Sequence, residues 1–173
     1  MASFTNFATL SYNGGTTNSN IVTGEILEAV TAVKTAVSAN YSAGDRITYA
    51  LSLVNTGTAA VTDYTVTDNL GGYTVGANTV YPLAYNAGTV RYYINGVLQA
   101  APTVTAGPPL TVTGLTVPAG GSAVLIYETT ATPVAPLATG SSITNTATIT
   151  GGGLTNPITA QATVETANSA ELS

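Results

Sequence analysis

Histidine, cysteine and tryptophan are absent from this sequence of 173 residues. Without imidazole and thiolate ligands, the usual zinc, haem, iron–sulfur and copper sites cannot be assembled. The same absence excludes Ser-His and Cys-His nucleophile pairs. It also excludes disulfides, so any unusual toughness has to come from packing, strand pairing or another covalent bond. We therefore expect no metal, no cofactor and no enzymatic function.

Charged residues are also scarce. They make up 6% of the chain and give a net charge of -5, whereas an average soluble domain is about 25% charged. A surface with so few cations has no basic face for phosphates, which excludes nucleic acid as a partner. No stretch reaches the roughly 18 consecutive apolar residues of a membrane span, so none is expected.

Threonine is abundant, at about a fifth of the chain, and valine and tyrosine are frequent. Such β-branched and aromatic residues favour strands. Apolar residues alternate with polar ones in Ile47–Leu53, and we expect further strands along the chain. These cover Ile26–Val37, Val61–Leu70, Arg91–Ile94, Val97–Gln99, Val104–Val117 around Pro108-Pro109, Ala123–Thr132, Ile143–Ile149 and Ala160–Val164.

Turn residues separate these segments at spacings typical of an all-β sandwich. Asn95-Gly96, between two of the predicted strands, is the strongest short hairpin signal. Helix signals are nearly absent, although the alanine and leucine content of Ile26–Val37 is also compatible with a short helix. We predict an antiparallel β-sandwich for residues 27–173.

The two ends of the chain resemble each other. Thr5–Ser11, followed by two glycines, is similar to Thr144–Thr150, which is followed by Gly152-Gly153. Residues 1–26 therefore look like a spare copy of the last hairpin of the domain. We predict an extra N-terminal β-hairpin or donor-strand extension, and its candidate polymerisation contacts are Phe4, Asn6, Phe7, Thr9 and Leu10. The alternative is a hairpin packed on its own domain.

Several short motifs together resemble a bacterial surface-protein repeat family, catalogued as domain of unknown function eleven. They are Lys34, Gly44–Tyr49, Val54–Gly57, Val66–Asp68 and Asn145–Thr148. The resemblance covers roughly residues 27–166. It implies an immunoglobulin-like sandwich used as a stalk or repeat unit in cell-envelope proteins. A lone unit with a duplicated hairpin is more similar to a polymerising subunit.

Self-crosslinking is the one reaction that this composition permits. In sandwich modules of Gram-positive surface proteins, a buried lysine attacks an asparagine carboxamide on the last strand with the help of a carboxylic acid. Lys34 is the only lysine, Asn145 lies on the predicted last hairpin, and Asp68 and Glu128 lie on intervening strands. The alternative is a solvated Lys34 balanced by an acid. Asn6 offers an intermolecular version of the same bond.

Two other groups of residues are weaker candidates. Asp45, Asp63 and Asp68 could supply oxygens to Ca²⁺, but solvated turn acids are the simpler interpretation. An aromatic binding face could be made by four tyrosines, which would otherwise cover a sheet: Tyr81, Tyr85, Tyr92 and Tyr93. The pair of Asp68 and Glu128 is a remote candidate for glycosidase chemistry.

We predict a structural subunit of a self-assembling filament at a bacterial cell or spore surface, with itself as partner in a head-to-tail homopolymer. Head-to-tail addition of a strand gives an open filament unless it closes into a ring. The alternative is a monomeric adhesin or stalk domain that binds a host protein or carbohydrate. The sequence leaves open which end donates the strand.

Overall fold

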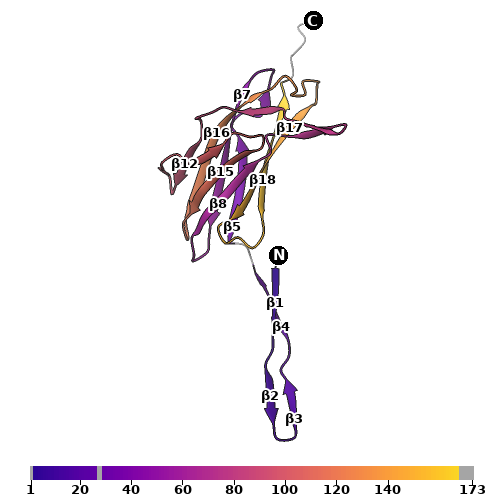
Figure 1. Ribbon diagram of the computed structural model, residues 1–173, viewed down its shortest axis with the longest axis vertical. Helices are drawn as coiled ribbons and strands as arrows, with labels where there is room; N and C mark the ends of the chain where they lie inside the picture. Colours follow the sequence, from indigo (N-terminus) through magenta and orange to yellow (C-terminus); the bar gives the residue numbers. More distant parts are fainter. Residues whose placement is uncertain (1, 27–28, 168–173) are drawn as a thin grey trace.

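A computed structural model describes residues 2–26 and 29–167, and Figure 1 shows its two parts. The described residues form strands and turns, with no helix that could cross a membrane. A β-sandwich makes up the body, and a separate two-stranded ribbon extends from one end of it.

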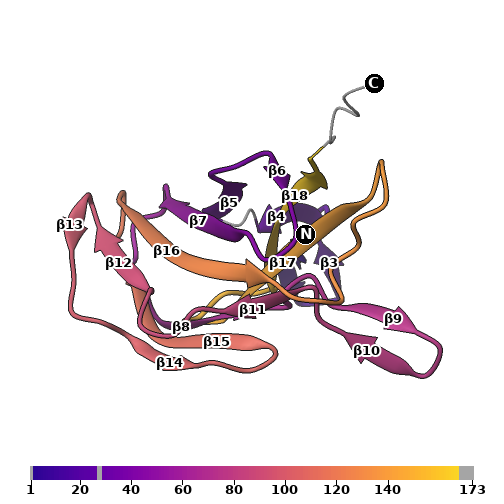
Figure 2. The same ribbon diagram turned by 90° about the horizontal axis from the view of Figure 1, so that it is seen from above.

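Two six-stranded sheets face each other, as the view from above shows (Figure 2). The first has the order β13-β12-β16-β7-β5, and β11 also pairs with β16. Its strands are β5 (Val30–Ala36), β7 (Arg46–Asn55), β11 (Leu83–Tyr85), β12 (Arg91–Ile94), β13 (Val97–Leu98) and β16 (Ser122–Ala131). The predicted all-β sandwich is therefore confirmed.

The second sheet has the order β14-β15-β8-β17-β18-β6. Its strands are β6 (Asn40–Tyr41), β8 (Val61–Asp68), β14 (Thr103–Thr105), β15 (Leu110–Val117), β17 (Ser142–Gly151) and β18 (Ile158–Thr166). The pairing is antiparallel except between β18 and β6, which run parallel over two residues. A small hairpin, β9 (Tyr73–Val75) and β10 (Asn78–Val80), projects from the body.

Alternation of side chains creates the core between the sheets. In β7, Ile47, Tyr49, Leu51 and Leu53 are buried while their neighbours are more exposed, as the period of a strand requires. In β16, Ala123, Leu125 and Tyr127 face the same core. Ile26–Val37 contains strand β5 rather than a helix, apart from residues 27 and 28, which lie outside the described residues.

Turn chemistry matches the sequence at the predicted hairpin. Asn95 and Gly96 both have positive φ angles, of 48° and 79°, and join β12 to β13. This is the backbone that a tight two-residue hairpin turn needs. Pro108-Pro109 separates β14 from β15, so the region Val104–Val117 forms two strands.

Strands β17 and β18 form the closing hairpin of the sandwich, with Asn145 opposite Ala162. On its other side β17 pairs with β8, and Ala147 lies opposite Asp68. The closing hairpin therefore lies within the second sheet, between β8 and β6.

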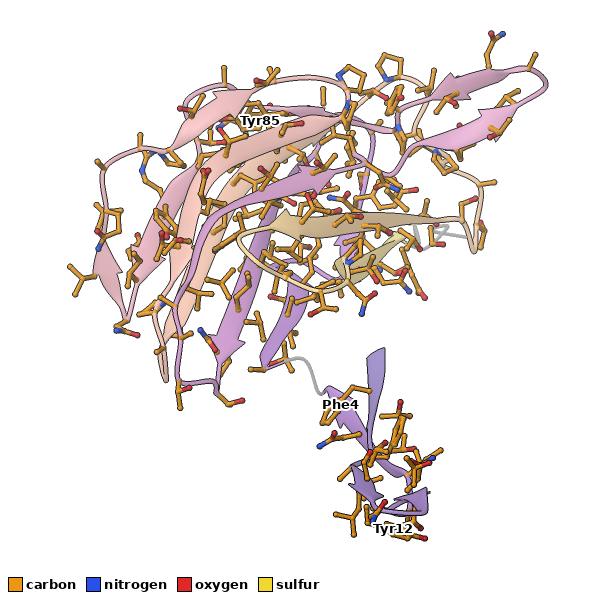
Figure 3. The ribbon with its side chains drawn as sticks, turned by 60° about the horizontal axis from the view of Figure 1, so that its bottom comes forward. Phe4, Tyr12 and Tyr85 are labelled. Atoms are coloured by element: carbon orange, nitrogen blue, oxygen red, sulfur yellow. The ribbon has the colours of Figure 1, made fainter. Side chains whose placement is uncertain are left out.

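The N-terminal ribbon consists of β1 (Ala2–Asn6), β2 (Thr9–Tyr12), β3 (Gly15–Asn18) and β4 (Val22–Ile26). β1 pairs with β4 and β2 with β3. Between the two ladders, Ser19 binds the backbone of Ala8 through both its amide and its hydroxyl. The ribbon extends away from the sandwich rather than lying on it (Figure 3), so the alternative of a hairpin packed on its own domain is not what the structure has.

Candidate functional site

Lys34 occupies the middle of β5, and its side chain is completely enclosed in the core. The alternation of β5 places it on the same face as Val30, while Thr31, Val33 and Thr35 point outward. The only lysine of the chain is therefore not solvated. A buried ammonium group requires a specific partner because desolvation disfavours the charge.

Asp68, at the end of β8, is that partner. Its Oδ2 accepts hydrogen bonds from the Lys34 ammonium and from the Tyr127 hydroxyl, and its side chain is fully buried. Its Oδ1 accepts a hydrogen bond from the backbone amide of Leu70 at 2.9 Å. The carboxyl group is thus fixed by three donors, and two of them, Lys34 and Tyr127, come from the opposite sheet.

Two tyrosines surround the lysine. Tyr49 and Tyr127 are directly opposite each other on β7 and β16, with ring centroids 6.0 Å apart. The Lys34 nitrogen lies 4.9 Å from the centre of the Tyr49 ring and 5.7 Å from that of Tyr127. The negative faces of the rings attract a cation at such distances.

Asn145 lies one diagonal step from Asp68 on the neighbouring strand β17 and is fully buried. Neither atom of its amide makes a hydrogen bond within the described part of the chain, and the Tyr49 hydroxyl also has no partner there. An unsatisfied buried polar group costs about 1–3 kcal/mol. Because burial of its unsatisfied amide costs this free energy, Asn145 is a candidate for a chemical role.

Burial is the main cause of the pKa shifts in this cluster. It lowers the pKa of Lys34, and the charge of Asp68 opposes that effect. Burial, followed by the Asp68 charge, raises the pKa of Tyr127 well above 10.0. The Asn145 amide lies near enough to both tyrosine hydroxyls to oppose their shifts, although it makes no hydrogen bond of ordinary geometry. The lysine is thereby biased toward the neutral amine, which is its nucleophilic form.

The arrangement can form an amide bond. Proton transfer from Lys34 to Asp68 leaves a neutral amine and a carboxylic acid. The amine nitrogen then attacks Cγ of Asn145, so that a Cγ–Nζ bond forms and the Cγ–Nδ2 bond breaks. The departing nitrogen takes up a proton released by the attacking amine and relayed through Asp68, and it leaves as ammonia. The aromatic enclosure keeps competing water away.

Glu128 does not belong to this cluster. It follows Tyr127 on β16 and therefore points to the outer face, where it lies 3.7 Å from the exposed Arg46. The prediction that it assists Lys34 is wrong, because successive residues of a strand face opposite sides. For the same reason Asp68 and Glu128 cannot flank one sugar. Tyr49 and Tyr127 are the residues that sequence reasoning missed.

The other predicted acids lie apart. The Oδ2 of Asp45 accepts a hydrogen bond from the Ser42 amide at 2.8 Å, and Asp63 sits at a positive φ of 61° in β8. Among the described residues, no group of acidic side chains could hold a metal ion. The four tyrosines do not form one face either, since Tyr92 is buried and its hydroxyl binds the backbone of Thr116.

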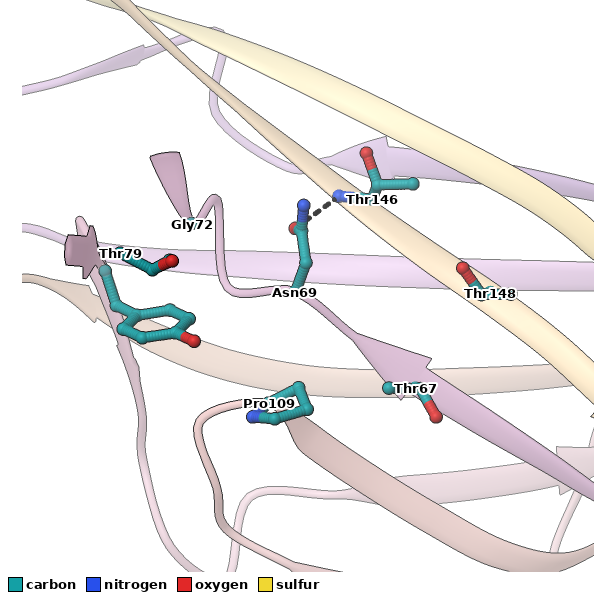
Figure 4. A pocket seen from close by; sticks show the side chains of 8 residues that line it. Thr67, Asn69, Gly72, Thr79, Pro109, Thr146 and Thr148 are labelled. Carbon is teal, nitrogen blue, oxygen red and sulfur yellow. Dashed lines mark hydrogen bonds between the residues drawn. The ribbon is translucent and has the colours of Figure 1, made fainter. Parts of the chain in front are cut away.

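A shallow pocket of about 340 Å³ opens on the outer face of the second sheet (Figure 4). The Oδ1 of Asn69 accepts hydrogen bonds from the amides of Gly71 and Thr146, at 3.0 and 2.9 Å. Its Nδ2 has no partner within the described part of the protein. The other lining residues are uncharged: Thr67, Gly72, Thr79, Tyr81, Pro109, Thr146 and Thr148.

The predicted polymerisation contacts all lie on the ribbon and are exposed. Phe4, Phe7 and Leu10 expose 55%, 54% and 63% of their surface. Tyr12, Ile21 and Val22 add further exposed apolar area. So many exposed large apolar side chains on one protruding element are typical of a surface that meets another molecule.

Comparison with protein-family models and with curated proteins finds no match. Solved structures do match. They include BcpA, the major pilin subunit of Bacillus cereus (18% identity, TM-score 0.56, 93% of this chain and 48% of that chain). They also include the pilus backbone RrgB of Streptococcus pneumoniae (15%, 0.54, 70% and 31%).

A third match is the N-terminal domain of the Streptococcus gordonii adhesin Sgo0707 (15% identity, TM-score 0.57, 79% of this chain and 32% of that chain). The chain thus spans between about a third and a half of the length of these structures. At such identities the similarity concerns the fold. The body of the molecule is an immunoglobulin-like β-sandwich of the kind found in pilin and adhesin domains.

Proposed function

We propose that this chain is a structural subunit of a self-assembling filament at a bacterial cell or spore surface, with its sandwich locked by an amide bond between Lys34 and Asn145. The hairpin of one subunit completes the sheet of the next by strand complementation. The observation that supports the locking bond is the enclosed cluster of Lys34, Asp68 and Asn145, whose amide has no hydrogen-bond partner among the described residues. The observation that supports assembly is the exposed apolar surface of the ribbon. The similarity of the chain's fold to pilin domains supports a bacterial surface location.

The locking bond is tested by the intact mass of the purified native chain. We expect a mass lower by one ammonia than the sequence requires, and a peptide in which Lys34 is joined to Asn145. Lys34→Arg and Asn145→Ala should each restore the full sequence mass, whereas Asn156→Ala should leave the loss unchanged. A native chain of full sequence mass would contradict the bond.

Assembly is tested by deleting residues 1–24. We expect folded monomers that no longer form filaments in negative-stain electron microscopy, because the sandwich retains both of its sheets without the ribbon. The native chain at the same concentration is the control. Filaments of unchanged length from the deleted chain would overturn the assembly proposal.

The outer pocket supports a second candidate function, a surface adhesin module for a neutral saccharide. Hydroxyl groups of Thr67, Thr146 and Thr148, the free amide of Asn69 and the Tyr81 ring are uncharged groups of the kind that bind sugars. Titration by NMR with chitotriose and with maltotriose would detect binding at these residues. An Asn69→Ala variant should abolish it, and absence of shifts with both sugars would count against this candidate.

A further inference from the structure

The inward face of the closing strand β17 has a counterpart in the N-terminal ribbon. Ile143, Asn145, Ala147 and Ile149 are all buried against the opposite sheet. The corresponding residues of the internal repeat, in the same order and at the same spacing, are Phe4, Asn6, Ala8 and Leu10, and all four are exposed. Three are apolar where β17 is apolar, and the asparagine recurs at the position that is diagonal to Asp68, the partner of Lys34.

The outward face is repeated as well. Thr144, Thr148 and Thr150 on β17 correspond to Thr5, Thr9 and Ser11 in the ribbon, so hydroxyl groups recur on the solvent side. The strand opposite is also comparable. Asn145 pairs with Ala162, and Asn6 pairs with Val22, so each asparagine lies opposite a small apolar residue. One difference is the interruption at Phe7 and Ala8, where Ser19 replaces part of the ladder.

We propose that the ribbon of one chain can take the place of the closing hairpin in a second copy of this chain, where Asn6 becomes the amide acceptor of Lys34. This inference rests on the locking bond of the proposed function and names a second amide acceptor for Lys34, which is used where the closing hairpin has not reacted. In that site β2 would pair with β8, as the second half of β17 does, and Phe4 and Leu10 would enter the space of Ile143 and Ile149. Exchange of equivalent elements is a known route to oligomers.

The covalent step is the same as within one chain. The Lys34 amine of the receiving copy attacks Cγ of Asn6, a Cγ–Nζ bond forms, and the Cγ–Nδ2 bond of Asn6 breaks. Asp68 of the receiving copy relays the proton, and one ammonia leaves per junction. Charge does not oppose the approach, because residues 4–23 contain no charged side chain.

Competition decides which hairpin reacts. The closing hairpin is tethered to its own sandwich, so its effective concentration is in the millimolar range, about a thousand times that of a neighbour at micromolar concentration. In the native chain Asn145 therefore reacts first and closes the site. When Asn145 is replaced, the closing hairpin can still dock but cannot react. A neighbouring ribbon that docks in its place can react through Asn6, and the amide bond then holds it irreversibly.

The test uses the full chain with Asn145→Ala. We expect dimers and longer ladders that survive boiling in detergent, each junction lighter by one ammonia, with Lys34 joined to Asn6 in peptide maps. The double variant Asn6→Ala, Asn145→Ala should stay monomeric. Asn18→Ala with Asn145→Ala is the matched control, since Asn18 is another exposed asparagine of the ribbon that accepts a bond from Thr9, and it should retain the ladders.

Circular dichroism and thermal melting establish that the variants fold, and Asn145→Ser serves if alanine does not. A folded Asn145 variant that remains monomeric would overturn the inference, as would ladders that persist without Asn6. Loss of ammonia in the native chain without ladders in the variant would refute only this inference. No loss in the native chain would refute the locking bond of the proposed function.

Discussion

At the scale of single residues, the most consequential contact is the buried pair of Lys34 and Asp68. Replacing one partner leaves the other charge without compensation, which typically costs about 3–5 kcal/mol. We expect Lys34→Met to lower the free energy of unfolding by about this amount and to abolish the loss of ammonia. Urea denaturation followed by tyrosine fluorescence measures the first effect, and mass spectrometry the second.

The double variant Lys34→Met, Asp68→Asn is the control for that prediction. It removes both charges, so the uncompensated carboxylate is gone and part of the stability should return. A single variant as stable as the native chain would mean that neither the pair nor the amide bond contributes.

Tyr127 is a positioning residue, since its hydroxyl donates a hydrogen bond to the Asp68 carboxyl group. We expect Tyr127→Phe to fold and to slow amide formation, because the carboxyl group loses one of the donors that orient it. The measurement is the rate of ammonia loss, followed by mass spectrometry during refolding of chain that was isolated unfolded before the bond had formed. Tyr64→Phe, a tyrosine buried elsewhere in the same core, should react at the native rate.

The residues of this cluster were only partly predictable from the sequence. Lys34, Asp68 and Asn145 could be named because they are the residue types that amide chemistry needs, and each lies on a predicted strand. Glu128 was included wrongly, although the alternation of Ala123, Leu125 and Tyr127 already placed it outside. Tyr49 and Tyr127 were missed because tyrosine is common in strands for packing alone.

At the scale of the elements, the turn of the closing hairpin has space for an added side chain at one glycine and not at the one before it. Gly152 has a φ of +64°, and a Cβ there would lie 2.5 Å from Val61 Cγ1. Gly153 has a φ of +86° with open space around it. We therefore expect Gly152→Ala to be less stable than Gly153→Ala by about 1–3 kcal/mol, the usual cost of overpacking.

Thermal denaturation of the two glycine variants checks this prediction. Both carry the backbone strain of a positive φ, so their difference reports the clash alone. Equal melting temperatures would mean that Val61 moves aside without cost.

Elements were predictable where alternation and turn residues coincide. Ile47–Leu53 shows a clear period of two, and Asn95-Gly96 marks its hairpin, and both are confirmed. The hairpin of β9 and β10 gave no such signal, because all but one of its residues are exposed and no face alternates. The short parallel pairing of β6 was also unpredictable, since it depends on where β18 ends in space.

At the scale of the whole molecule, stability should fall in strongly alkaline solution. Burial raises the pKa of Tyr49, Tyr64 and Tyr127 above their ordinary value of 10.0, so these groups stay protonated in the fold and ionise on unfolding. Each contributes stability below pH 10 that is lost as the pH rises, with a slope of up to about 1.4 kcal/mol per pH unit.

Where Lys34 remains a free amine, as in an Asn145→Ala variant, its contribution has the opposite sign, whereas the amide-bonded Lys34 of the native chain does not titrate. The pKa of the free amine is lowered from 10.5, so that stability rises with pH until about that value and then no longer changes. Denaturant midpoints measured above pH 10.5 should therefore report the tyrosines alone. Removing one of them with Tyr49→Phe should flatten the decline, and a pH-independent midpoint for the native chain would contradict the prediction.

The position of Lys34 and Asn145 in the chain has a mechanical meaning. Lys34 lies on the first strand of the sandwich and Asn145 on the last but one. With an amide bond between them, tension that enters through the ribbon and leaves after β18 would pass directly across that bond. Residues 35–144 would then carry no load, and the subunit would extend only by the short segments outside the link.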